Sequence, residues 1–156
     1  MLDALVIGAG PAGLMAAEEL AKAGRRVVIC EGKSSPARKF LMAGKSGLNI
    51  TKAQALPAFA AAYQSPHMAL FLDEFGPEAV MGWCNQLGAE VFTGSSGRVF
   101  PKAMKASPLL RAWLARLAGM GKAEWKRAVK AERAARRLEK MPKAAKKRAT
   151  RPKAPK

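Results

Sequence analysis

The chain has 156 residues, of which 49% are hydrophobic and 25% are charged, close to the average for globular proteins. This length and composition indicate a folded protein with a real core, and they exclude a fibrous repeat, wholesale disorder and most complete two-domain enzymes. The unusual property is charge, because 28 Lys and Arg residues against 11 Asp and Glu residues give a formal net charge of +17.

The excess positive charge is concentrated in the last part of the sequence. Residues 1 to 121 carry 13 basic and 8 acidic side chains, a net of +5, whereas residues 122 to 156 carry 15 basic and 3 acidic, a net of +12. We therefore predict a folded part over residues 1 to 121 and a basic tail, rich in Ala, Lys and Arg, over residues 122 to 156. The composition of the tail predicts helix first and disorder after Pro142.

The cysteines and the apolar stretches indicate the compartment. Cys30 and Cys84 have no CxxC spacing, which predicts neither a disulfide framework nor a zinc site and favours a reducing compartment. The N-terminus lacks the basic flank of a secretory signal. The longest uncharged stretch, residues 53 to 72, is interrupted by prolines and polar groups. We expect a cytoplasmic protein without a membrane span.

The first elements predict a parallel βαβ unit. Apolar residues 5 to 7 predict a short strand that ends at the glycine-rich residues 8 to 13. A helix follows, since residues 14 to 21 carry apolar side chains at helical spacing and Gly24 stands where a helix end favours positive φ. Residues 27 to 30 are apolar throughout, which is typical of a strand buried on both faces of a parallel sheet.

The later elements are expected to be shorter and mixed. Residues 32 to 51, rich in Gly, Ser and basic side chains, predict a long irregular connection of the kind that contacts ligands. Two short helices are predicted, over residues 67 to 75 and 77 to 87, followed by a hairpin over residues 91 to 100. An apolar stripe from residue 109 to 117 then predicts a helix packed on the core, with Ser107 as its N-cap.

The sharpest motif is GxGxxG at Gly8, Gly10 and Gly13, between the first predicted strand and helix. Glu31 stands 23 positions after Gly8, at the end of the next strand, which is the context that gives this motif its specificity. Gly8 permits the tight turn, Gly10 lets the backbone approach a pyrophosphate, and Gly13 allows the helix to pack on the strand. Pro11 suits the first helical turn, whose other amides stabilise phosphate charge.

Glu31 is predicted to accept hydrogen bonds from a ribose diol, and its charge disfavours a 2′-phosphate. The motif therefore favours FAD or NAD over NADP. The alternative is a βα turn with a purely structural role. No residue can be assigned to catalysis, and His67, the only histidine, is more typical of a surface residue at a helix start.

Residues 6 to 17, together with Glu31, resemble the FAD-binding start of two-dinucleotide-fold flavoproteins. Residues 37 to 51 and 97 to 110 are similar to a bacterial family whose members are called NAD(P)/FAD-dependent oxidoreductases or aminoacetone oxidase-like FAD-binding enzymes. The resemblance covers residues 1 to about 118. It implies an α/β fold, a Rossmann-like FAD-binding βαβ unit with added helices and a β-hairpin, in which residues 1 to 121 form the N-terminal part of the FAD/NAD(P)-binding domain.

The resemblance also implies the cofactor contacts. FAD would place its pyrophosphate at the opening turn and its ribose at Glu31, with further residues along the cofactor. The implied contacts are Gly8, Gly10, Pro11, Ala12, Gly13, Glu31, Arg38, Lys39, Gly47, Leu48 and Asn49. Without the resemblance, Arg38 and Lys39 are better explained as a solvated loop. NAD(P)H is a candidate electron donor with no residue assigned to it, and the small-molecule substrate is unknown.

Members of this family are longer, with a second domain and a late glycine-containing segment that closes the flavin site. This sequence leaves the pattern near Gly119, as a truncated or frame-shifted reading frame would. The predicted function is the FAD-binding N-terminal segment of a flavin-dependent oxidoreductase with an incomplete active site. Residues 5 to 7 should then form an exposed apolar edge, because the strands that flank the first strand of such a sheet come later in the chain.

A second class of function stays open at the basic tail. Residues 122 to 156 would bind nucleic acid or anionic surfaces without sequence preference, by releasing counterions from phosphates. Trp125 is the only aromatic residue in this segment, so base stacking is not indicated. The competing interpretation, which we favour, is that the tail is incidental.

Overall fold

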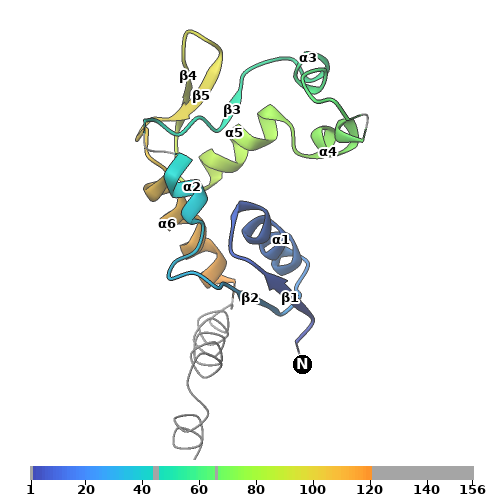
Figure 1. Ribbon diagram of the computed structural model, residues 1–156, viewed down its shortest axis with the longest axis vertical. Helices are drawn as coiled ribbons and strands as arrows, with labels where there is room; N and C mark the ends of the chain where they lie inside the picture. The colour runs from blue at the N-terminus through green and yellow to red at the C-terminus, as the bar shows by residue number, and fades with distance from the viewer. Residues whose placement is uncertain (1, 44–45, 66, 121–156) are drawn as a thin grey trace, which may run out of the picture. The chain divides into compact units, whose positions relative to one another are not determined.

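The structure is a computed structural model, and it describes residues 2–43, 46–65 and 67–120 (Figure 1). The described residues divide into two compact units, one ending at Pro36 and the other spanning Ala37–Met120. The predicted tail, residues 122 to 156, lies outside the described residues. None of the helices in the described ranges combines the length and the apolar character that crossing a bilayer requires.

The first unit is a βαβ unit with the predicted order of elements. Strand β1 (Ala4–Ile7) is followed by helix α1 (Pro11–Lys22) and strand β2 (Val27–Cys30). The two strands pair in parallel, in register from Ala4 opposite Val27 to Ile7 opposite Cys30. Gly24 follows α1 with a φ of 73°, as the sequence predicts. The parallel pair confirms the predicted α/β class.

The two faces of the β1–β2 sheet differ in burial. Val27 and Ile29, only 3% and 2% exposed, share one face because they alternate along β2, and α1 packs against both strands. Leu5 and Ile7 point to the other face and are 54% and 85% exposed. Among the described residues β1 pairs with β2 alone, so the expected apolar edge at residues 5 to 7 is observed, and Leu5 and Ile7 also lie on an exposed face of the sheet.

The second unit combines short helices with a three-stranded antiparallel sheet (Figure 1). The strands lie in the order β3-β5-β4. In chain order the elements are α2 (Arg38–Ala43), β3 (Thr51–Lys52), α3 (Leu56–Ala60), α4 (Met68–Glu74), α5 (Pro77–Gln86), β4 (Val91–Thr93), β5 (Arg98–Pro101) and α6 (Ala106–Gly119). Helices α4 and α5 and the β4–β5 hairpin confirm the predicted elements to within a few residues.

Three elements of this unit are not predicted by the sequence. Helix α2 interrupts the expected irregular connection, and α3 and β3 lie where no element is expected. Helices of six and five residues are too short to show a periodic apolar pattern. Strand β3 exists through its partner, since Thr51 pairs with Val99 and Lys52 with Arg98. The expectation for residues 32 to 51 is thus wrong where α2 and β3 form.

Helix α6 provides much of the core of the second unit. It buries Leu109, Leu110, Trp113 and Leu117, which are four of the predicted stripe residues. The Trp113 ring meets the Trp83 ring edge to face, with centroids 4.8 Å apart. The predicted N-cap is wrong, because α6 begins at Ala106 after Lys105, without a side-chain cap hydrogen bond, and Ser107 lies inside its first turn.

We expect Leu5→Thr to reduce aggregation without a large loss of stability. Threonine, unlike leucine, is β-branched and so has a high strand preference, and it removes exposed apolar surface from an unprotected edge. The free energy of unfolding should change by less than about 0.5 kcal/mol, as at other exposed positions. Static light scattering at rising protein concentration measures the effect. Leu70→Thr, at a leucine 70% exposed on α4, is the control, and an equal benefit there would contradict a special role for the edge.

Candidate dinucleotide-binding site

The glycine turn between β1 and α1 leaves its backbone open on one side. Gly8 has a φ of 101°, which favours glycine, and its amide donates to the Cys30 carbonyl at 2.7 Å. Gly10 is the N-cap of α1. A Cβ built on Gly8 or Gly10 would meet no atom within 4 Å. A ligand can therefore reach the backbone here, which a side chain would prevent.

Gly13 lies where α1 comes closest to the turn. A Cβ at this position would lie 2.0 Å from the Gly8 carbonyl oxygen and 3.3 Å from Cγ1 of Val6. No side chain fits at such a distance, so glycine is required for packing before any ligand is considered. The contact brings the first turn of the helix directly over the end of β1.

The start of α1 has the properties of an anion site. The helix has 12 residues, begins with Pro11, and has no side-chain cap at Gly10. Amides in the first turn of a helix have no intrahelical acceptor, and the helix dipole gives that end a partial positive charge. The amides of Ala12 and Gly13 belong to this turn, because the first intrahelical bond runs from the Leu14 amide to the Gly10 carbonyl at 2.9 Å.

Glu31 joins this turn to the end of β2. Its Oε2 accepts a hydrogen bond from the Ala9 amide at 2.9 Å, and its Oε1 accepts one from the Lys33 amide at 2.7 Å. Ala9 is fully buried, so the carboxylate is the partner of an amide in the interior of the turn. This role is not predicted from the sequence, although an acidic residue directly after β2 and beside a glycine turn is a signal that could indicate it.

The residues of the first unit fit the adenosine diphosphate part of a dinucleotide. Open backbone at Gly8 and Gly10, uncapped amides in α1 and a carboxylate held at the turn supply the groups that a diphosphate and a ribose need. Each oxygen of Glu31 carries a second lone pair, so the carboxylate can accept from a ribose hydroxyl while it keeps its backbone bonds.

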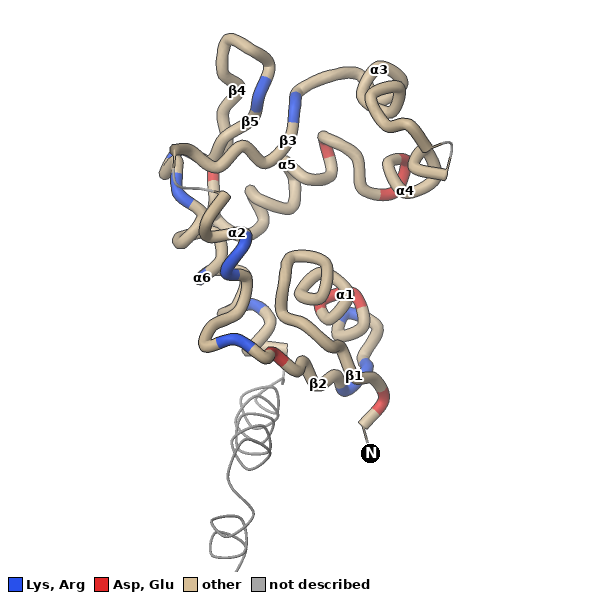
Figure 2. Tube along the Cα trace, in the orientation of Figure 1, with Lys and Arg blue, Asp and Glu red and all other residues tan. Residues whose placement is uncertain are grey.

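The other predicted contacts belong to the second unit, and their relation to a cofactor stays a prediction. Arg38 and Lys39 are exposed at the start of α2, where Figure 2 shows basic residues in blue. Leu48 is 2% exposed, so almost none of this residue is accessible to a ligand. Gly47 is half-buried and Asn49 is exposed.

The segment that contains Gly47, Leu48 and Asn49 lies along β5. The Leu48 amide donates to the Met104 carbonyl at 3.0 Å, the Ile50 amide to the Val99 carbonyl at 2.9 Å, and the Ala53 amide to the Gly97 carbonyl at 2.8 Å. The two later segments on which the family resemblance rests, residues 37 to 51 and 97 to 110, are thus neighbours in the fold. Their joint occurrence in the sequence has a structural basis.

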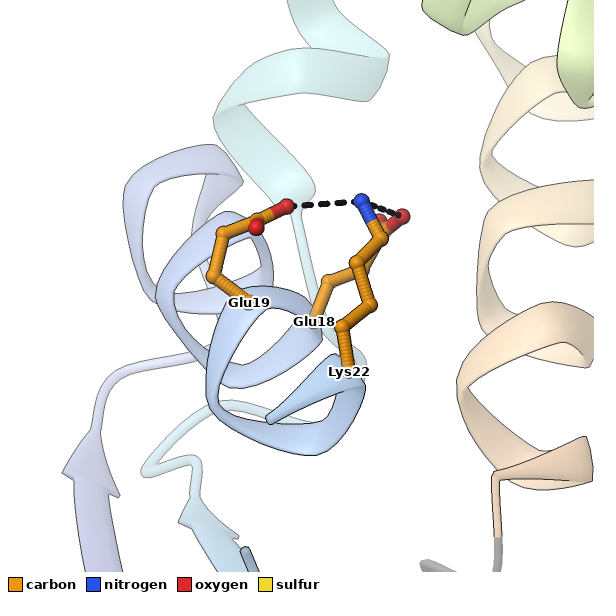
Figure 3. A network of polar contacts seen from close by, with 3 residues as sticks. All are labelled: Glu18, Glu19 and Lys22. Carbon is orange, nitrogen blue, oxygen red and sulfur yellow. Dashed lines mark hydrogen bonds and ion pairs between the residues drawn. The ribbon is translucent and has the colours of Figure 1, made fainter. Parts of the chain in front are cut away.

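Other ionisable groups in the described residues serve packing and charge balance. On α1, Nζ of Lys22 lies 2.7 Å from Oε1 of Glu19 and 3.2 Å from Oε1 of the buried Glu18 (Figure 3). The hydrogen bond to Glu19 is the main cause that raises the pKa of Lys22, which stays charged near neutrality. Burial raises the pKa of Cys84 to about 11, which makes this thiol inert. The described ranges hold no group of three or more His, Cys, Asp or Glu able to bind a metal.

A parallel βαβ unit with a glycine turn, a close helix contact at Gly13 and a carboxylate after β2 is a Rossmann-type dinucleotide-binding unit. A family model described as "HI0933-like protein Rossmann domain" matches residues 2–151, and the chain belongs to this family of FAD-binding flavoproteins. The resemblance predicted from the motifs is confirmed. The matched range ends at residue 151, whereas the resemblance seen in the motifs ends at about residue 118.

Two curated relatives match part of the chain. Both are named ribosomal RNA dihydrouridine synthase. The Escherichia coli K12 protein is 40% identical over 65 residues, which are 42% of this chain and 16% of that protein. The Haemophilus influenzae protein is 40% identical over 63 residues, which are 40% of this chain and 16% of that protein. The aligned segment thus spans about a sixth of either relative.

A solved structure also resembles the chain. It is titled "Crystal structure of Thermovibrio ammonificans THI4" and shares 23% sequence identity with this protein at a TM-score of 0.46. The likeness covers 78% of this chain and 36% of the other.

We expect Gly13→Ala and Gly10→Ala to differ sharply in stability. The methyl group at residue 13 meets backbone, so it should lower the free energy of unfolding by about 1 to 3 kcal/mol. The methyl group at residue 10 meets open space and should cost less than about 1 kcal/mol, the usual scale for an N-cap change. Urea unfolding followed by far-ultraviolet circular dichroism compares the two. Equal midpoints would show that the close contact at Gly13 is absent in solution.

Proposed function

We propose that this chain binds FAD through its first unit and is the cofactor-binding segment of a flavin-dependent oxidoreductase. The observation that supports this most is the hydrogen bond between Glu31 and the Ala9 amide. It keeps a carboxylate beside the turn whose helix amides suit a diphosphate. The diphosphate and the adjoining ribose of one FAD molecule would then each meet a matching group.

Each residue of the turn has a distinct part in this proposal. Gly8 and Gly10 expose backbone to the pyrophosphate, and Ala12 and Gly13 donate their amides to it. Pro11 starts the helix without an amide that needs a partner. A further group is proposed to lie along the same cofactor, comprising Arg38, Lys39, Gly47, Leu48 and Asn49.

The redox chemistry in this proposal is that of the flavin, which exchanges electrons when it is bound. The residues named here bind and orient the cofactor. No residue is proposed as catalytic, and NAD(P)H stays a candidate electron donor. Since the aligned segment spans 16% of each curated relative, the substrate is left open. We expect this chain to bind FAD without turnover in the presence of NAD(P)H.

The direct test is equilibrium titration of the purified chain with FAD, followed by quenching of flavin fluorescence. We expect Gly10→Ala to weaken binding by about tenfold or more, because its methyl group occupies the approach to the pyrophosphate. Glu31→Gln should weaken binding by a similar factor, because hydrogen bonds to a charged acceptor contribute about 1.5 to 3 kcal/mol.

The matched control is Glu90→Gln, which removes an exposed carboxylate in the second unit that pairs with Lys102. It should leave the FAD titration unchanged. No binding up to tens of micromolar FAD, in protein whose circular dichroism shows it to be folded, would reject the proposal.

A second candidate function, from a different class, is binding of nucleic acid by residues 122 to 156. Two observations favour it: the net charge of +12 in this segment, and the names of both curated relatives, which are ribosomal RNA enzymes. We propose a sequence-independent contact of its Lys and Arg side chains with RNA phosphates. This function is compatible with FAD binding by the first unit.

Salt dependence tests the second candidate. We expect the logarithm of RNA affinity to fall linearly with the logarithm of salt concentration, with a slope of about 0.7 to 0.9 per phosphate neutralised. Replacing Lys143, Lys146 and Lys147 together by Gln should make the slope shallower. The control replaces Arg25, Arg26 and Lys52 by Gln. If both triple variants reduce the slope equally, the contact is not located in the tail.

A further inference from the structure

Met104 connects β5 to α6 through an unfavourable backbone conformation. Its φ is 55°, which lies in the left-handed region. This conformation is energetically unfavourable for any residue other than glycine, because the Cβ atom clashes with the backbone. Its amide donates to the Pro101 carbonyl at 2.8 Å, which closes the turn just before α6. Glycine would adopt the same conformation without steric cost. A methionine at such a position points to a role for its side chain.

The Met104 side chain lies against Gly47. A Cβ built on Gly47 would be 2.9 Å from Cε of Met104 and 3.9 Å from the Phe100 ring, so the methionine methyl fills the place of a side chain at residue 47. Gly47 itself has a φ of 129°, open only to glycine. The next residue is held as well, since the Met104 carbonyl accepts the Leu48 amide at 3.0 Å. Met104 therefore grips two consecutive residues.

The rest of this segment is anchored independently. The Ile50 and Ala53 amides bond to β5 and to the turn before it, and the Leu48 side chain is in the core. Among these three backbone hydrogen bonds of the described segment, the one from the Leu48 amide to the Met104 carbonyl comes first in the sequence. What the segment offers to a ligand is the backbone at Gly47 and the exposed side chain of Asn49.

We infer that Met104 is a positioning residue for cofactor binding: its side chain and carbonyl hold residues 47 to 49 in one conformation before the cofactor arrives. The inference rests on the proposed function in one respect, that residues 47 to 49 contact FAD. A segment ordered in advance avoids the entropy that a loose one loses on binding. The strained backbone at Met104 is the cost of placing a long side chain where glycine would otherwise be favoured.

Two variants separate strain from grip. Met104→Ala keeps the strained φ and removes the side chain, whereas Met104→Gly removes both. We expect Met104→Gly to be at least as resistant to urea as Met104→Ala, although glycine is normally the less stable choice. Met42→Ala is the control, since Met42 is another methionine of the same unit and is 59% exposed on α2.

Hydrogen exchange then measures the grip without any cofactor. In both Met104 variants the Leu48 amide should exchange faster, by about tenfold or more. The reason is that loss of the methionine side chain lowers the free energy of local opening at residues 47 to 49. The Ala53 amide should exchange at the rate of the unchanged chain, and Met42→Ala should alter neither. FAD affinity should fall about two- to tenfold in both Met104 variants, the range expected for newly mobile groups.

The outcomes are distinguishable. An unchanged exchange rate of the Leu48 amide would show that Met104 does not hold residues 47 to 49, whatever the effect on FAD affinity. Faster exchange with unchanged FAD affinity overturns the role in cofactor binding. If the unchanged chain fails to bind FAD, the proposed function falls and the cofactor role of Met104 falls with it, while exchange at Leu48 still decides whether the grip exists. Loss of folding in Met104→Gly would also overturn the inference, since relief of strain predicts a stable variant.

Discussion

The hydrogen bond from the Ala9 amide to the Glu31 carboxylate is the interaction on which the first unit depends. A buried amide without a partner costs about 1 to 3 kcal/mol, and Ala9 lies beyond the residues of β1 that pair with β2. Because the same carboxylate also accepts a hydrogen bond from the Lys33 amide, it links the turn after β1 to the loop after β2 at one end of the sheet. Its use in ligand recognition follows from this place, since the carboxylate is held where the turn opens.

Two opposite uses of backbone freedom shape the candidate cofactor contacts. At Gly13 the Gly8 carbonyl approaches so closely that no side chain fits, and at Gly47 a positive φ favours glycine while the Met104 methyl lies against it. At Met104 a side chain is kept despite a backbone that favours glycine. Glycine allows two parts of the chain to pack closely, whereas the Met104 side chain and carbonyl hold residues 47 and 48 in place. The Gly13 contact is local, with Gly8 and Val6, whereas the Gly47 contact joins segments more than fifty residues apart in the sequence.

Family membership and partial coverage have different consequences for function. A match over residues 2–151 to a Rossmann domain family establishes the kind of protein, and the geometry of the turn explains what such a domain would hold. The relatives align over a sixth of their length, so their chemistry is a source of hypotheses about substrate. The exposed side chains of Leu5 and Ile7 show that α1 covers one face of the β1–β2 sheet and leaves the other accessible among the described residues.

The sequence by itself determined the βαβ unit, the glycine turn, the acid after β2, the hairpin and the helix that carries Trp113, because apolar spacing and glycine conformation are local properties. Tertiary structure alone decided that Glu31 binds the Ala9 amide and that Met104 grips Gly47, since such partners are brought together by packing. It also decided α2, β3 and the start of α6 at Ala106. Elements this short have too few residues to show a period, and their formation depends on what lies beside them.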